Sequence, residues 1–97
     1  MAESVEELTI EYTEDDIVTV KELAKVVLTK GAWATVMFRY QDWDRTKSEY
    51  SPEKYAIRRY QKRDGQYQMR SKFVFSSADQ ARQIIETLEL WLNDKPA

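Results

Sequence analysis

Residues 54–75, KYAIRRYQKRDGQYQMRSKFVF, decide the fold of this chain. Two segments rich in aromatic and aliphatic side chains flank Asp64-Gly65, a dipeptide typical of a type I′ turn because both central residues of that turn take a positive φ. A two-residue turn places Arg63 opposite Gln66, and the remaining register follows by counting outward from it. The sequence therefore predicts an antiparallel hairpin at this position.

The predicted register sorts the side chains of the hairpin onto two faces, because alternate residues of a strand point to opposite sides of a sheet. One face carries Ala56, Arg58, Tyr60, Lys62, Tyr67, Met69, Ser71, Phe73 and Phe75. The other carries Tyr55, Ile57, Arg59, Gln61, Gln68, Arg70, Lys72 and Val74. In this register Arg59 lies opposite Arg70, and Ile57 lies opposite Lys72.

Two further strands are expected before the hairpin. Residues 32–41, AWATVMFRYQ, alternate as a strand does, and Lys30-Gly31 supplies the turn that precedes them. Residues 17–29 fit two structures. A helix would begin at a capping box formed by Thr19 and Glu22 and end before Gly31, whereas the many Val and Ile residues favour a strand, which is the interpretation we prefer.

The rest of the chain completes an α+β fold. Residues 77–93 predict an amphipathic helix capped by Ser77, and residues 42–53 a polar loop. Residues 1–16 are expected to be an acidic flexible leader, although the alternation of Leu8, Ile10 and Tyr12 also allows a short edge strand. We expect a β-β-β-β-α binding domain over residues 17–94, in which a four-stranded antiparallel sheet carries the helix on one face and leaves the other open. Because so small a domain buries only a modest core, we also expect a homodimer.

The composition excludes most catalytic chemistry. The chain of 97 residues contains neither cysteine nor histidine, which removes the thiolate nucleophile, the commonest general base and the commonest metal ligand. The pair Asp42 and Asp44 lacks a third ligand nearby in the sequence. We expect no enzyme activity, no cofactor, no bound metal and no small-molecule substrate. The sequence also lacks a signal peptide and a long apolar run, so we expect a cytoplasmic protein that does not associate with membranes.

The formal net charge of -2 hides an uneven distribution along the chain. Residues 1–29 hold eight acidic residues against two lysines, whereas residues 30–72 hold eleven Lys and Arg against five acidic residues. Residues 73–97 return to an excess of acid, with four acidic residues against two basic ones. An anionic partner is therefore expected at the middle of the chain.

The open face of the predicted sheet combines cations, amides and aromatic rings. Like charges directly opposite each other on a sheet are unfavourable, so the predicted pair Arg59 and Arg70 indicates a bound anion such as phosphate. Aromatic side chains would stack on unpaired bases while the cations follow the backbone of a single strand. The candidate nucleic-acid-binding residues are Trp33, Arg39, Tyr55, Arg59, Gln61, Gln68, Arg70 and Lys72.

Two motifs give the chain a family resemblance. Lys30-Gly31-Ala32-Trp33 opens a strand, and Lys54-Tyr55-Ala56-Ile57-Arg58-Arg59-Tyr60 forms a later one, before a hairpin and a closing amphipathic helix. In this respect residues 20–92 resemble the positive-cofactor-four transcriptional coactivator family, and its bacterial single-stranded-DNA-binding members most of all. The resemblance implies a β-β-β-β-α subunit that dimerises and binds single-stranded DNA, or RNA, with little sequence preference, as an accessory factor in transcription or repair.

A second interpretation of the same residues needs no nucleic acid. The aromatic side chains could close the sheet edges, the arginines could pair with acids of the leader or the loop, and the leader could contact another protein. The chain would then be a small protein–protein interaction module.

Overall fold

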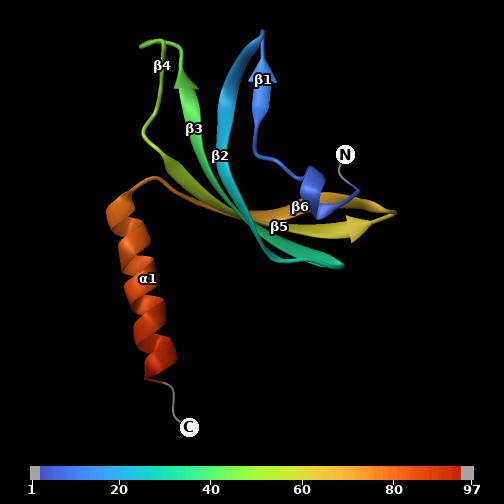
Figure 1. The fold of residues 1–97 in the computed structure, drawn as a ribbon, viewed down its shortest axis with the longest axis vertical. Helices are drawn as coiled ribbons and strands as arrows, with labels where there is room; N and C mark the ends of the chain where they lie inside the picture. Colours follow the sequence, from blue (N-terminus) through green and yellow to red (C-terminus); the bar gives the residue numbers. More distant parts are fainter. Residues whose placement is uncertain (1–2, 95–97) are drawn as a thin grey trace.

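The computed structural model describes residues 3–94 and shows a curled antiparallel sheet from which one helix projects (Figure 1). The sheet order is β1-β2-β3-β5-β6, and the short β4 pairs with the far end of β3. The elements are η1 (Val5–Glu7), β1 (Tyr12–Glu14), β2 (Ile17–Thr29), β3 (Trp33–Asp44), β4 (Glu49–Tyr50), β5 (Lys54–Arg63), β6 (Gln66–Phe75) and α1 (Ala78–Asn93). The α+β class is confirmed, but the prediction of four strands omitted the two short strands β1 and β4.

The ambiguous residues 17–29 form a strand, as their Val and Ile content favours. β2 pairs with β3 along most of its length, and its first residues, Ile17 to Val20, also pair with β1 on the other side. Its register against β3 shifts twice, between Glu22 and Ala24 and between Val27 and Thr29. These irregularities accompany the curl of the sheet, since bulges bend the strand that contains them.

The hydrophobic core lies on one side of the curled sheet, which we call the core face. Strands β3 and β5 contribute Ala34, Val36, Phe38, Tyr40, Ala56 and Tyr60, and β6 contributes Tyr67. The remaining three residues of this core are Val5, Leu8 and Ile10, which lie in the segment expected to be a flexible acidic leader. Their burial was not anticipated. The Glu residues between them are typical of a flexible segment, and the alternation of Leu8, Ile10 and Tyr12 indicated only a short edge strand.

A bulge in β6 changes the predicted register of the hairpin. Near the turn the pairs agree with the predicted register, with Arg63 opposite Gln66 and Gln61 opposite Gln68. The register then shifts between Arg59 and Tyr60, so that Arg59 lies opposite Ser71, and Arg70 is the extra residue. The prediction that Arg59 lies opposite Arg70 is therefore wrong.

Beyond the bulge the faces of β6 are exchanged relative to the prediction. Phe73 lies opposite Ile57 and Phe75 opposite Tyr55, while Lys72 lies opposite Arg58. Directly opposed residues of an antiparallel pair share a face. Lys72 therefore lies on the side of the core face, and the prediction that it lies opposite Ile57 is wrong.

Helix α1 does not pack flat against the sheet. Ser77 caps it as predicted, with the backbone N–H of Gln80 donating to Ser77 Oγ at 3.2 Å. The helix then runs away from the strands, and none of its described residues is buried (Figure 1). The core face is already covered by residues 5–10, and α1 instead begins beside the opposite side of the sheet. The expectation that the helix covers the core and leaves the basic side open is therefore wrong. Within residues 3–94 no helix is both long and apolar enough to span a bilayer.

Candidate nucleic-acid interface

A row of polar and aromatic side chains crosses three strands on the side opposite the core, which we call the second face. Trp33 of β3 lies opposite Gln61 of β5, and Gln61 lies opposite Gln68 of β6. Arg59 lies one position along the same face of β5, and its guanidinium carbon is 4.6 Å from the centre of the Trp33 ring. The pairing of the strands thus brings an indole, two amides and a guanidinium together.

The bulge adds Arg70 to this row. Its Nε donates to Gln61 Oε1 at 3.1 Å and its Nη2 donates to Gln68 Oε1 at 3.2 Å. These two bonds hold the guanidinium over the second face although the register around it is irregular. We call Trp33, Arg59, Gln61, Gln68 and Arg70 the Trp33–Arg70 cluster.

The two arginines of the Trp33–Arg70 cluster have no acidic partner in the described part of the chain. Among residues 3–94, carboxylates instead pair with Arg39, Arg45 and Lys54, all nearer the other end of the sheet. Arg59 and Arg70 are both exposed, and 42% of the Trp33 surface is exposed. The positive charges of Arg59 and Arg70 are therefore available to an anion from solution.

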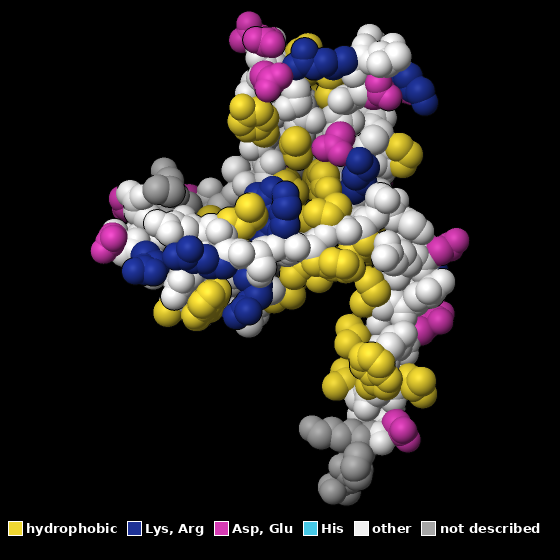
Figure 2. Space-filling model, turned by 180° about the vertical axis from the view of Figure 1, so that it is seen from behind, with side chains coloured by type: hydrophobic (Ala, Val, Ile, Leu, Met, Phe, Trp, Pro, Cys, Tyr) yellow, Lys and Arg dark blue, Asp and Glu magenta, His cyan; other side chains and the backbone are white. Residues whose placement is uncertain are grey.

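The geometry suits a ligand that carries both negative charge and flat rings. A guanidinium binds phosphate oxygens through two parallel N–H donors, and an exposed indole stacks on a base. The amide groups of Gln61 and Gln68 can donate to and accept from the edges of bases. Lys and Arg side chains gather toward the end of the sheet where the β5–β6 turn lies, at the left of Figure 2.

Three predicted site residues are not part of the Trp33–Arg70 cluster. Arg39 and Tyr55 lie opposite each other on the second face, but six residues along β3 from Trp33, which corresponds to about 20 Å of extended strand. Arg39 Nε is 3.2 Å from Glu53 Oε1, and Tyr55 stacks on Phe75 with ring centres 5.5 Å apart. Lys72 is on the core-face side because of the bulge.

The groups with shifted pKa values lie elsewhere in the molecule. Burial raises the pKa of Tyr40, and Asp42 acts in the same direction. The hydrogen bond from Lys54 Nζ to Asp42 Oδ2, at 2.6 Å, raises the pKa of Lys54. Within residues 3–94 no group of three or more Asp and Glu side chains is arranged to hold a metal ion.

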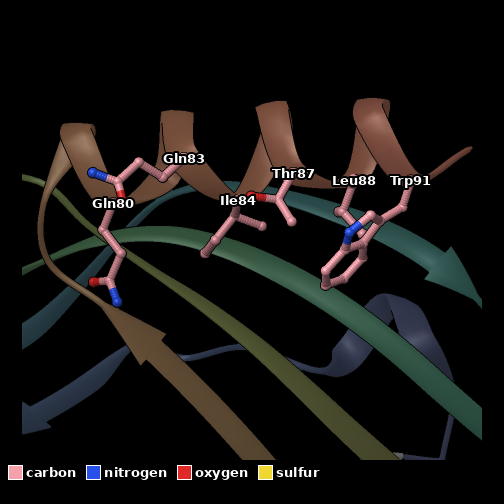
Figure 3. Close-up of a pocket in the computed structure, with 6 residues that line it drawn as sticks. All are labelled: Gln80, Gln83, Ile84, Thr87, Leu88 and Trp91. Carbon is pink, nitrogen blue, oxygen red and sulfur yellow. The ribbon is translucent and has the colours of Figure 1, made fainter. Parts of the chain in front are cut away.

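Sequence reasoning missed an apolar groove between α1 and the second face. The groove has a volume of about 590 Å³ and is lined by Leu28, Met37, Tyr55, Ile57 and Phe75 of the sheet and by Ala78, Ala81, Arg82, Ile84, Ile85 and Leu88 of the helix. Ile84, Leu88 and Trp91 project from the same side of α1 (Figure 3). The apolar helix stripe was visible in the sequence, but it was expected to be buried within the subunit.

Comparison with protein-family models, curated proteins and solved structures gives no match for this chain.

Proposed function

We propose that this protein binds single-stranded nucleic acid, DNA or RNA, through the Trp33–Arg70 cluster. The observation that carries the proposal is the presence of two exposed arginines without acidic partners beside an exposed indole and two amide side chains, within residues 3–94. Arg39 and Tyr55 lie too far along the second face from Trp33 to belong to this site, and Tyr55 lines the apolar groove. The proposal agrees with what the resemblance to the coactivator family implies about partners, and a role in transcription or repair is part of that proposal.

A single strand fits this surface better than a duplex. Reading a duplex in its major groove requires a helix or a protruding two-stranded ribbon with polar side chains. Helix α1 carries Asp79, Glu86 and Glu89 against Arg82, and the rest of its surface is largely apolar. A sheet face with an exposed ring instead suits bases that are free to unstack.

Fluorescence anisotropy with a labelled single-stranded oligonucleotide tests this proposal. We expect affinity that falls steeply with salt, because bound phosphates release counterions, and weaker binding to a duplex of the same length. The double substitution Arg59→Glu/Arg70→Glu should lower the affinity by at least about 100-fold, since it replaces two phosphate contacts with two repulsive charges. Far-ultraviolet circular dichroism verifies that the variant is folded.

The matched control is Lys21→Glu/Lys47→Glu, which changes the net charge equally toward the other end of the sheet. This control should bind within a few-fold of the wild type. Equal losses in the two double variants would show non-specific charge attraction rather than a site. Absence of binding by the wild type at low salt would contradict the proposal and favour a protein–protein interaction module.

We also propose that two copies of the chain associate through α1 and the apolar groove. Leu88 is 49% exposed and Trp91 67% exposed on a helix whose apolar side has no covering element among the described residues. The space-filling view shows hydrophobic side chains along the helix and at its junction with the sheet (Figure 2). Each copy offers both an apolar helix and an apolar groove, so a two-fold arrangement lets each helix cover the partner's groove. Burying one Leu or Ile in this way contributes about 1.5–3 kcal/mol.

Sedimentation equilibrium of matched helix variants tests the association. Leu88→Asp places a charge in the groove and should convert a dimer into monomers. Leu90→Asp introduces the same charge at a residue that does not line the groove and should leave the dimer intact. A monomeric wild-type protein, or equal dissociation of both variants, would contradict this arrangement.

A further inference from the structure

The sheet ends at β6, whose outer edge has no neighbouring strand among the described residues. In a regular strand Arg70 and Lys72 would share a face, because they are two residues apart. The bulge separates them, so that Arg70 bonds to amides on the second face while Lys72 lies opposite Arg58 on the core-face side. Cations therefore flank this free edge on both sides.

The core-face side of the hairpin carries its own group of cations. Arg58 and Lys72 are directly opposite each other, an arrangement that is unfavourable unless an anion lies between or beside them. Lys62 lies opposite Tyr67 and its Nζ is 5.4 Å from the centre of that ring. Within residues 3–94 no carboxylate forms an ion pair with any of these three cations.

The hydrogen-bond donors of Arg58, on this side of the hairpin, find few partners within the protein itself. Its Nε is buried and has no hydrogen-bond partner within the described part of the chain, and its Nη1 reaches only the Tyr60 hydroxyl, at 3.5 Å. The guanidinium carbon lies 5.8 Å from the centre of the Phe38 ring. Lys62 and Lys72, in contrast, are exposed and can contact a ligand without any rearrangement of the core.

We propose that a bound single strand crosses the free edge of β6 and continues from the Trp33–Arg70 cluster onto a second phosphate subsite formed by Arg58, Lys62 and Lys72. This inference rests on the proposed function, because the second subsite extends the path of the same ligand. The bulge is then a functional feature, since it divides the cations of one strand between the two faces. A short oligonucleotide would occupy the second face alone, and a longer one would reach both sides.

Anisotropy with oligothymidylates of about 5, 10, 15 and 20 nucleotides tests the crossing, because this range brackets the usual length of a single-strand site. The variant Lys62→Glu/Lys72→Glu should bind the shortest strand within about twofold of the wild type and the longest at least about tenfold more weakly. Its salt dependence on the longest strand should also decrease, by a slope of about 0.7 for each phosphate that the variant no longer neutralises. Arg59→Glu/Arg70→Glu should weaken binding at all lengths.

The variant Lys21→Glu/Lys47→Glu is again the charge-matched control. The ratio of its affinity to that of the wild type should be the same at every oligonucleotide length. The inference is overturned if Lys62→Glu/Lys72→Glu follows this control at every length, or if its affinity decreases equally for short and long strands. Either result would leave the Trp33–Arg70 cluster as the binding site. If the wild type binds none of the oligonucleotides, the proposed function fails and the second subsite fails with it.

Discussion

At the scale of single residues, Lys25 fastens the N-terminal segment to the sheet. Its ammonium donates to the backbone carbonyl oxygens of Val5 at 2.7 Å, Glu6 at 3.1 Å and Leu8 at 2.6 Å. The Val5 carbonyl also accepts from the backbone N–H of Leu8, at 3.3 Å, so Lys25 adds a charged donor at the end of η1. One long side chain on β2 therefore holds the residues that complete the core.

Replacement of Lys25 by Met keeps the aliphatic stem and removes the three hydrogen bonds. We expect the free energy of unfolding to fall by about 1–3 kcal/mol, because hydrogen bonds to charged groups contribute more than neutral ones. Urea denaturation followed by circular dichroism measures the change. Lys30→Met, at an exposed position in the turn before β3, serves as control. Equal stability of both variants would show that the Lys25 hydrogen bonds contribute nothing.

The Glu7 carboxylate makes the stability of the folded N-terminal segment depend on pH. The backbone N–H groups of Glu3 and Ser4 donate to Glu7 Oε2, at 2.6 and 3.3 Å, and this lowers the pKa of Glu7. A lowered pKa in the folded state means that the unfolded chain takes up a proton first as the pH falls. The stabilisation is thus present near neutral pH and is lost as the pH falls from the ordinary glutamate range through the lowered pKa.

The variant Glu7→Gln tests this dependence. Its urea midpoint should be lower than that of the wild type at neutral pH. The difference should shrink as the pH falls through the lowered pKa of Glu7, below which both forms carry an uncharged side chain. Glu86→Gln, on the exposed surface of α1, is the control. A difference that stays constant across this pH range would contradict the assigned role of the Glu7 carboxylate.

At the scale of elements, the hairpin shows how far a sequence pattern determines register. Asp64 and Gly65 have φ values of 54° and 78°, so the type I′ signal was a correct guide to the turn and to the four pairs nearest to it. The bulge at Arg70 was not predictable, because neither Gly nor Pro interrupts Met69-Arg70-Ser71. The surrounding alternation of side chains allowed a regular strand equally well. The error moved Lys72, but not Arg59 or Arg70, away from the predicted face.

Gly65 offers a direct test of the turn. An added Cβ would meet no atom within 4 Å, so Gly65→Ala is penalised only by the positive φ of this residue. We expect the free energy of unfolding to fall by about 1 kcal/mol for Ala, and by less for Asn, which tolerates that conformation better. Thermal denaturation of both variants measures the difference. Ala and Asn variants of equal stability would contradict the turn geometry.

At the scale of the whole molecule, the sequence predicted the elements better than their packing. Five of the eight proposed binding residues lie together on one face, because hairpin register near a turn and strand alternation are local properties. Which apolar surface covers the core is decided by contacts between distant segments. Residues 5–10 cover the core, and the helix with its apolar side stands apart. Local periodicity could not distinguish a helix that covers its own sheet from one that is free to contact a second copy.

The most direct test of the account is a nitrogen–proton correlation spectrum recorded during titration with a single-stranded oligonucleotide. The chain has three tryptophans, and Trp43 and Trp91 lie outside the Trp33–Arg70 cluster, so their indole N–H signals are internal controls. We predict that the Trp33 indole signal, the side-chain amide signals of Gln61 and Gln68, and the Nε–H signals of Arg59 and Arg70 shift together. The controls should stay nearly unchanged. Unmoved Trp33 and Arg70 signals at saturating oligonucleotide would contradict the central claim.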